Sequence, residues 1–390
     1  MMPNNWSRRS LVKGLVGAAT GGALSQPLHG LLWQQLMGMQ RGELGRMATA
    51  FKSSFSVPAL SVAISRQGQF VYDQGFGMAD QKDLTPANMS TSFRVASVTK
   101  PITSVTIFTL IEQGKLNLND KVFGPSGILG TQYGKTPYLQ YVTDITVDHL
   151  LTHTCGGWPN DSTDPMFRFD SWDQAKLIGW TLQNLRLAYP PGQHWAYSNF
   201  GYCLLGRVIE QVTGQPYGAY VASNILAPCG ISNMRIAGNS LRQRAPEEAV
   251  YVGQYNEDPY KMNVTRMDSH GGWIATPSSL VQFLDHVAGS GSIPSMLKPE
   301  TIRVMTTPSP AYPAGSGGKY ARGWMVGNNG AGNWWHSGSL PGSTTLMVRT
   351  ATGLCWAALA NTRTEPHAQI DAAMDQMMWN MVRSVPAWEA

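Results

Sequence analysis

Charge is the first property that this chain of 390 residues has little of. Asp, Glu, Lys and Arg make up 14% of the residues, against about a quarter in ordinary globular proteins. The net charge is only +5, and no run of Lys and Arg forms a stripe, so nucleic-acid binding has no support. Hydrophobic residues reach 43%, which excludes a disordered chain. The length suffices for a large core and for two lobes.

Cysteine is scarce, and no metal-binding pattern is complete. The four cysteines are widely spaced without a C-x-x-C pair: Cys155, Cys203, Cys229 and Cys355. The sequence leaves open whether they pair in disulfides or remain buried thiols. His149 and His153 have the spacing of a metalloprotease helix, but Leu150 stands where that motif needs Glu. We therefore expect structural histidines and no metal site.

The apolar run near the N-terminus, residues 14–24, is too short to span a bilayer. It follows a basic segment in which Arg8 and Arg9 resemble the twin-arginine type of export signal. The pattern predicts a signal over residues 1–25, with cleavage near residues 23–25. It also predicts contact with the export machinery and a periplasmic or secreted location. The alternative is an ordinary basic N-terminal helix.

Strand patterns frame the chain. Residues 59–65 and 70–76 read as one hairpin, and residues 344–349 and 354–360 read as a second. Helical patterns predominate between these ends, and a long one closes the chain at residues 367–382. The order predicts an α+β fold in which one antiparallel sheet is assembled from both chain ends and flanked by helices.

The same order predicts two lobes with the active site in the cleft between them. Residues 26–120 and 315–390 would form an α/β lobe, and residues 121–314 an inserted, mostly helical lobe. Two helices are marked clearly in the pattern. One covers residues 102–113, and the other covers residues 200–213 and is followed by Gly214, a typical C-terminal cap.

A serine stands three residues before a lysine at four places, so this spacing alone decides nothing. Only Ser97 opens a strong helical pattern, which puts Lys100 one turn along on the same face. Pro101 falls in the first turn, where its missing N–H costs least. The dipole and free N–H groups at that helix end favour developing negative charge. A serine needs a base to remove its proton, and a buried lysine can serve.

Two further motifs supply partners for this pair. Tyr197 and Asn199 form the chain's only Tyr-x-Asn, at the end of a rigid turn. Residues 335–342, WHSGSLPG, read as an edge strand with His336, a hydroxyl and a glycine that allows close backbone approach. Taken alone, Tyr197 reads equally well as a loop aromatic, whereas a histidine such as His336 is more often packed in the core than catalytic. Together the motifs provide what an acyl-enzyme route needs, without a metal or an organic cofactor.

In order and spacing, these three motifs resemble the penicillin-recognising serine hydrolases. That superfamily includes class C β-lactamases, D-Ala-D-Ala carboxypeptidases, D-aminopeptidases and family VIII esterases, and its fold is β-lactamase/transpeptidase-like. The resemblance runs from about residue 50 to 385. It includes LLTHTCGGWP, which starts at Leu150, and YSNFGYCLLG, which runs from Tyr197 to Gly206.

The resemblance implies a role for each residue of the first two motifs. Ser97 would be the acylated nucleophile. Lys100 and Tyr197 would share the work of the general base. Asn199 would position the amide or carbonyl group of the substrate.

The resemblance also implies roles for the third motif. His336 and Ser337 take the places of the lysine and threonine in the Lys-Thr-Gly element of β-lactamases, with Gly338 as its glycine. The backbone N–H groups of Ser97 and Ser339 would form the oxyanion hole. Such donors are each worth about 2.7–4 kcal/mol towards the transition state.

Departures from the family pattern bear on the substrate. Histidine at position 336 has at most a partial charge at neutral pH, which weakens the grip on a substrate carboxylate. Forms with His-Ser-Gly resemble D-peptidases and esterases more than dedicated β-lactamases. Asp161 falls where class C enzymes keep a glutamine, and an acid there favours a cationic or hydroxyl-bearing substrate. The class A deacylating glutamate element is missing, so we expect slow acylation by β-lactams without efficient turnover.

The sequence thus predicts an exported serine hydrolase that cleaves a small ester, amide or peptide, with D-residue peptides and carboxylic esters as leading substrates. A β-lactamase or an acyltransferase would use the same acyl-enzyme. A hypothesis of another class is a catalytically silent binding protein that keeps the fold. Loss of Lys100 would abolish turnover in the first case and leave ligand affinity nearly unchanged in the last.

Overall fold

The structure, a computed structural model, describes residues 26–315, 317–327 and 330–385, with the backbone alone for residues 26–37. The predicted export signal lies outside the described residues. The helices are α2 (Gln26–Ser54), α3 (Thr99–Glu112), α4 (Val147–Leu151), α5 (Gln174–Asn184), α6 (Asn199–Thr213), α7 (Tyr217–Val221), α8 (Pro277–Ala288), α9 (Pro299–Thr306) and α10 (Ala368–Arg383). The strands are β1 (Ala59–Arg66), β2 (Gln69–Asp80), β3 (Thr85–Pro86), β4 (Phe93–Arg94), β5 (Arg235–Ile236), β6 (Trp273–Ala275), β7 (Lys319–Tyr320), β8 (Met325–Val326), β9 (Trp334–Leu340), β10 (Ser343–Arg349) and β11 (Leu354–Ala360).

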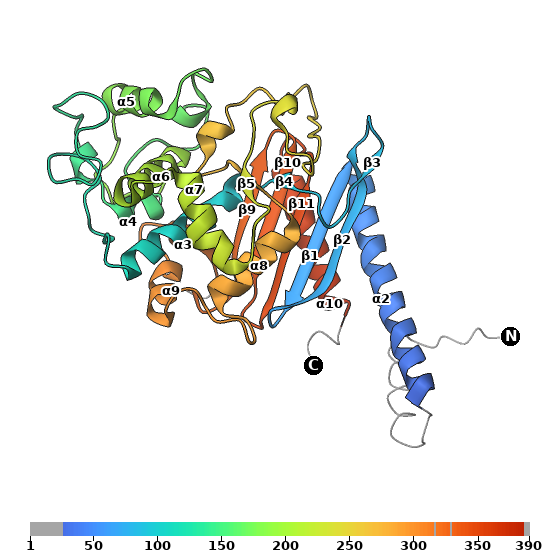
Figure 1. Cartoon of the computed structure of the whole chain (residues 1–390). Coiled ribbons are helices and arrows are strands. Elements are labelled where there is room, and N and C mark those ends of the chain that lie inside the picture. Colours follow the sequence, from blue (N-terminus) through green and yellow to red (C-terminus); the bar gives the residue numbers. More distant parts are fainter. Residues whose placement is uncertain (1–25, 316, 328–329, 386–390) are drawn as a thin grey trace.

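The two chain ends meet in one sheet, as predicted. Within the described residues the strand order is β3-β2-β1-β11-β10-β9-β8-β7, and the pairs are antiparallel. Strand β1 lies beside β11, so that Leu60 faces Ala360 and Arg66 faces Leu354. The blue N-terminal strands and the red C-terminal strands lie next to each other in Figure 1. The predicted fold class is confirmed.

Helices cover both faces of this sheet, which explains why its central strands β1, β10 and β11 are buried along almost their whole length. Helix α8 packs on β1 and β11 from one side, and α10 packs on β10 and β11 from the other, next to α2. Alternate residues of β1 divide between the two cores: Ala59 and Ala63 join the larger one, whereas Leu60 and Val62 join the one under α10. Helices α3 to α7, which lie between the chain ends in sequence, lie together on the left of Figure 1. The exact domain boundaries remain a prediction.

Strand β9 departs from the prediction. It was expected at the edge of the sheet, but β8 and β7 continue the sheet beyond it. Only Trp334 and Trp335 of β9 pair with β8. From His336 onward, β9 therefore pairs only with β10 among the described strands. Its other edge is left unpaired by these strands, next to the cavity described below.

All four cysteines lie in the described part of the chain, where they are buried and free. Among the described helices, none is both long and apolar enough to cross a membrane.

Candidate active site

A strained turn carries the predicted nucleophile. Ser97 lies in the 3₁₀ turn Ala96–Val98, and helix α3 begins two residues later, at Thr99. The residue before the serine, Ala96, has a φ of 48°, a left-handed conformation that costs a non-glycine residue free energy. Ser97 lines the main cavity. The turn therefore presents its hydroxyl at the cavity wall, just ahead of the helix and not within it.

Lys100 has three acceptors within reach of its amine. Its Nζ lies 3.1 Å from Ser97 Oγ, 2.8 Å from Asn199 Oδ1 and 2.9 Å from the main-chain oxygen of His270. An ammonium group has three N–H donors, so the charged form is fully satisfied. A neutral amine has two, and the amide and the carbonyl can accept both. Its lone pair then points to Ser97, in the geometry that removes a hydroxyl proton.

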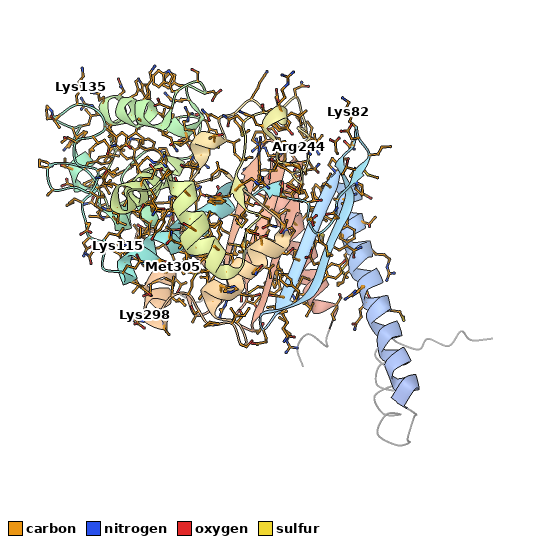
Figure 2. The ribbon with its side chains drawn as sticks, in the orientation of Figure 1. Lys82, Lys115, Lys135, Arg244, Lys298 and Met305 are labelled. Carbon is orange, nitrogen blue, oxygen red and sulfur yellow. The ribbon has the colours of Figure 1, made fainter. Side chains whose placement is uncertain are left out.

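Burial changes the charge preference of this lysine. Its side chain is 0% exposed, and desolvation lowers the pKa of Lys100 to about 7, although the charge of Asp164 acts in the opposite direction. Figure 2 shows the contrast with labelled lysines such as Lys82, Lys135 and Lys298, which lie at the outer surface. A large fraction of Lys100 is therefore the neutral base at neutral pH.

Tyr197 stands on the other side of the nucleophile. Its ring centroid lies 4.8 Å from Lys100 Nζ, and the ring of His153 packs against it at 4.2 Å. His153 Nδ1 accepts a hydrogen bond from the N–H of Ser198 at 3.1 Å, which holds the tyrosine loop. Burial raises the pKa of Tyr197, and a side-chain hydrogen bond with Ser97 opposes this increase. Tyr197 is therefore a neutral phenol in the resting site, placed to pass a proton on.

The amide of Asn199 is fully engaged by the protein. Its Oδ1 accepts from Lys100, and its Nδ2 donates to Asn160 Oδ1 at 2.9 Å and to Asp164 Oδ2 at 2.8 Å. An amide nitrogen has two hydrogens, so no donor remains for a substrate. Asn160 lines the cavity and accepts this bond with its side-chain oxygen.

His336 is neutral in this structure. Its Nδ1 lies 2.6 Å from the main-chain oxygen of Ser337, and its Nε2 lies 3.3 Å from the hydroxyl of Tyr320. Because a carbonyl oxygen only accepts, Nδ1 must have the hydrogen and Nε2 must accept from the tyrosine. Burial, together with the charge of Lys100, lowers the pKa of His336 to about 3. Both ring nitrogens are occupied, and the side chain offers no cation to a substrate.

The backbone of β9 runs directly against the nucleophile turn. A Cβ on Gly338 would lie 2.3 Å from Val95 O, 2.4 Å from Thr345 Oγ1 and 3.0 Å from the nitrogen of Ser97. Only glycine fits there. Ser337 and Ser339, on either side, line the cavity, and no described residue provides a hydrogen-bond partner for Ser339 Oγ.

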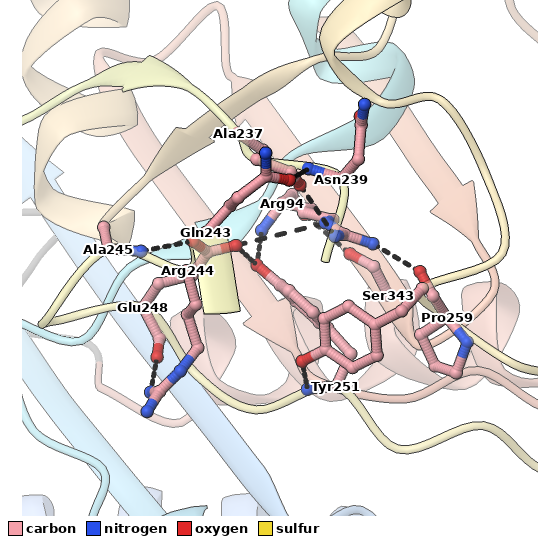
Figure 3. Close-up of polar contacts among 12 residues, drawn as sticks. Arg94, Ala237, Asn239, Gln243, Arg244, Ala245, Glu248, Tyr251, Pro259 and Ser343 are labelled. Carbon is pink, nitrogen blue, oxygen red and sulfur yellow. Dashed lines mark hydrogen bonds and ion pairs between the residues drawn. The ribbon is translucent and has the colours of Figure 1, made fainter. Parts of the chain in front are cut away.

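A polar cluster around Arg94 holds strand β4, which precedes the turn that contains Ser97 (Figure 3). The hydroxyl of Tyr251 accepts from the backbone N–H of Arg94 at 2.7 Å and donates to Glu248 Oε1 at 2.7 Å. The guanidinium of Arg94 donates to the main-chain oxygens of Pro259 and Gly238. Ser343 Oγ donates to Arg94 O at 2.6 Å. These bonds tie β4, three residues before Ser97, to strand β10 and to the loop around residue 250.

These elements enclose a cavity of ≈ 950 Å³. Six of the nine predicted site residues line it: Ser97, Tyr197, His336, Ser337, Ser339 and, on the rim, Asp161. Gly338 packs against the nucleophile turn instead. Lys100 and Asn199 lie directly behind Ser97.

Asp161 is exposed, and its Oδ1 accepts from the N–H and the hydroxyl of Thr163, which lowers its pKa. It reaches the cavity without contacting the Lys100 cluster. Four residues that contact the predicted site residues were not part of any motif recognised in the sequence: Asn160, Asp164, His270 and Tyr320. The only hint in the sequence was the segment NDSTDP, residues 160–165, in which two aspartates follow the predicted rim of the cleft. In the described part of the chain, no group of His, Cys, Asp and Glu could hold a metal ion.

Comparison with known proteins defines the class to which this fold and site belong. A model of the family described as Beta-lactamase matches residues 44–376. The chain therefore belongs to the Beta-lactamase family, within the serine β-lactamase/transpeptidase-like superfamily that its motifs resemble. At the level of the family, the prediction of a serine hydrolase is confirmed.

Relatives identify particular proteins that the chain is similar to. It is 27% identical to penicillin-binding protein 4* of Bacillus subtilis (strain 168) over 323 residues, 74% of this chain and 64% of that protein. It is 30% identical to Protein flp of Staphylococcus aureus over 172 residues, 44% of this chain and 33% of that protein. The chain thus spans less than two thirds of the curated relatives it matches.

Solved structures share the fold. D-amino acid amidase from Ochrobactrum anthropi SV3 superposes with a TM-score of 0.71 at 21% identity, covering 88% of this chain and 99% of that one. The octameric penicillin-binding protein homologue from Pyrococcus abyssi gives 0.69 at 24% identity, covering 88% and 79%. At such identities the likeness concerns the fold.

Proposed function

We propose that this protein is a serine hydrolase that forms an acyl-enzyme on Ser97 and cleaves a small carboxylic ester or an amide, including D-residue peptides. One observation carries the proposal. The amine of Lys100 lies 3.1 Å from Ser97 Oγ while Asn199 and the carbonyl of His270 occupy two of its three directions. A merely structural lysine has no need of a pKa near 7 beside a serine hydroxyl.

The residues divide the reaction as follows. Neutral Lys100 takes the proton of Ser97 while the serine oxygen forms a bond to the carbonyl carbon of the substrate. The backbone N–H groups of Ser97 and Ser339 donate hydrogen bonds to the oxyanion that forms. When the carbon–oxygen or carbon–nitrogen bond to the leaving group breaks, that group takes a proton from Lys100 by way of the Tyr197 phenol. Water then attacks the ester on Ser97 with the same base, which releases the acid and restores the serine.

The cavity favours substrates without a carboxylate at the reacting end. His336 is neutral, and the acid Asp161 lies on the same cavity. Two further acids that line it, Glu365 and Asp371, pair with Arg363 and His367, which line it as well. Apolar walls come from Phe167 and Trp195. This combination suits an acyl ester or an amide with a free amino group. The neighbour D-amino acid amidase, solved with L-phenylalanine amide, supports the amide class. A β-lactamase or an acyltransferase remains the second candidate, because either would use the same acyl-enzyme.

We also propose that the protein is exported through its N-terminal segment to the periplasm or outside the cell. Arg8 and Arg9 before a short apolar run motivate this proposal. N-terminal sequencing of protein recovered from the periplasmic or culture fraction would show cleavage near residues 23–25. An intact N-terminus in the cytoplasmic fraction would reject it.

Intact-mass spectrometry tests the acyl-enzyme. The protein is exposed to a fluorophosphonate and, separately, to a penicillin, alongside Ser97→Ala and the control Ser295→Ala, a second serine of a Ser-x-x-Lys spacing. We expect one covalent adduct in the wild type and the control, and none in Ser97→Ala. A long-lived penicillin adduct indicates an esterase or peptidase, and a brief one a β-lactamase. Folded wild-type protein without any adduct would favour the silent binding protein instead.

A further inference from the structure

A buried carboxylate outside the predicted motifs reaches the catalytic cluster. Asp164 is 1% exposed. Its Oδ1 accepts from the backbone N–H of Met166 at 2.8 Å, as the N-cap of the 3₁₀ turn Pro165–Phe167. Its Oδ2 accepts from Asn199 Nδ2 at 2.8 Å. A cap requires one carboxylate oxygen, and the second oxygen is directed to the amide that contacts Lys100.

The orientation of that amide depends on what surrounds it. An ionised carboxylate only accepts hydrogen bonds, so the NH₂ side of Asn199 must face Asp164. Asn160 Oδ1, the second neighbour, accepts from the same nitrogen. The oxygen of Asn199 is thereby turned towards Lys100. With the opposite orientation, an N–H donor would face the N–H donors of the lysine.

We propose that Asp164 is a positioning residue for the reaction on Ser97. It holds the Asn199 amide in the orientation that presents an oxygen to Lys100, and its negative charge stabilises the ammonium that Lys100 becomes during acylation. The inference rests on the proposed function, because it assigns Asp164 an effect on the base of that reaction.

The charges around Lys100 support this role. His153, His270 and His336 face the lysine from three different segments, and burial lowers the pKa of each, which keeps all three neutral. The phenols of Tyr197 and Tyr202, whose rings lie near the amine, have pKa values raised by burial. The negative charge of Asp164 instead raises the pKa of Lys100.

Burial raises the pKa of Asp164 to about 6. The bonds to Asn199 and to Met166 N–H and the charge of Lys100 lower this pKa, and the charge of exposed Asp161 raises it. Asp164 is therefore ionised at the pH at which Lys100 acts, and it loses its charge below about pH 6. The amide loses its forced orientation over the same range.

Asp164→Asn tests the inference. The amide keeps an oxygen at only one of the two carboxylate positions, so an NH₂ group at the other faces the donor of Met166 or of Asn199. We expect kcat/KM for an uncharged ester to fall about tenfold to a hundredfold, the range for losing a hydrogen bond with a charged partner. Removal of the negative charge also lowers the pKa of Lys100. The acid limb of the pH profile should therefore move to lower pH, even though the plateau falls.

Two further variants separate this role from capping. Asp173→Asn is the matched control, since Asp173 caps helix α5 by accepting from Lys176 N–H at 2.7 Å on the exterior. It removes the same charge at a capping position outside the site, so it should keep nearly all of its stability, because Asn caps about as well as Asp, and it should keep the wild-type acid limb. Asp164→Ser retains a side chain that can cap but lacks the charge and the reach to Asn199. It keeps the test valid if Asp164→Asn does not fold.

The readouts are kcat/KM from pH 5 to 9, the rate of fluorophosphonate labelling of Ser97, and the urea midpoint. A limb displaced to lower pH in the folded Asp164 variants, with Asp173→Asn unmoved, supports the inference. A limb unchanged in these variants, or activity lost only in proportion to folded protein, overturns it. In both cases a labelled wild type keeps the proposed function intact. A wild type without adduct would reject that function itself.

Discussion

The amine of Lys100 donates to the main-chain oxygen of His270, 170 residues further along the chain, at 2.9 Å. This bond is independent of any side-chain motif. Together with the bond to Asn199, it leaves one direction of the amine free for the serine hydroxyl. The lysine is also buried, and the desolvation lowers its pKa, which determines how activity should depend on pH.

Activity should rise with pH through about 7. Lys100 must be neutral to accept the proton of Ser97, and its pKa is lowered to about 7 by burial. Below that pH, kcat/KM for an uncharged ester should approach a fall of tenfold per pH unit, the behaviour of one required base. The fall should become steeper below about pH 6, where Asp164 also loses its charge. Stopped-time assays from pH 5 to 9, with circular dichroism to show that the fold persists, measure it. A flat profile down to pH 5, or a limb near the ordinary lysine pKa, would contradict this assignment.

A carboxylate on the substrate should bring no advantage, even in acid. His336 has a pKa lowered to about 3, so it gains no charge between pH 8 and pH 5. Benzylpenicillin and its methyl ester form a matched pair for this comparison. The ratio of their acylation rates should stay constant over that range, although both rates fall as Lys100 becomes protonated. A growing preference for the free acid below pH 6.5 would indicate that His336 becomes an imidazolium.

Gly338→Ala should damage catalysis far more than its size suggests. The added Cβ would approach Val95 O to 2.3 Å, so β9 must move away from the nucleophile turn. A displacement of about 1 Å at a reacting group can cost a hundredfold in rate. We expect a loss of that order in fluorophosphonate labelling of Ser97.

The control for this change is Gly315→Ala, where a Cβ would meet nothing within 4 Å. It should label at the wild-type rate. Equal labelling of both variants would show that the contact between β9 and the turn does not matter for the chemistry.

Tyr251→Phe should weaken the support of the same turn. The hydroxyl accepts from Arg94 N–H and donates to Glu248, and its removal leaves both buried groups short of a partner. The free energy of unfolding should fall by about 1–3 kcal/mol, measured by urea denaturation. Tyr255→Phe is the control, because Tyr255 is 71% exposed and its hydroxyl can bond to water. Identical midpoints for the two variants would mean that the cluster contributes nothing.

The local sequence pattern was sufficient to predict those helices and strands whose formation depends mainly on residues close together in the chain. The two hairpins and helix α10 occur where alternation and periodicity indicated them, within about two residues, except that β2 continues four residues further, to Asp80. The pairing of Ser97 with Lys100 was also predictable, because residues three apart meet across one turn whether that turn is 3₁₀ or α-helical. Tyr197 and Asn199 could be recognised from a motif, although their distance from Ser97 could not.

The remaining contacts depend on loops that meet only after folding. Asp164 and Asn160 stand on an irregular segment that has no periodic pattern, so nothing in the sequence indicated that they would reach Asn199. The main-chain oxygen of His270 has no sequence signature at all. Strand β9 was expected at an edge because its partner β8 is a pair of residues, Met325–Val326, too short to be marked by alternation.

By itself, the sequence determined which chemical groups are available: a serine hydroxyl, a lysine amine, a phenol, an imidazole and a glycine between two serines. The tertiary structure decided which of them carry charge. Lys100 and His336 are ordinary cations or partial cations in water, and burial in the fold removes the water that stabilises those charges. A base and a neutral imidazole result, because desolvation depends on every segment packed around a group and not on the residues beside it in the chain.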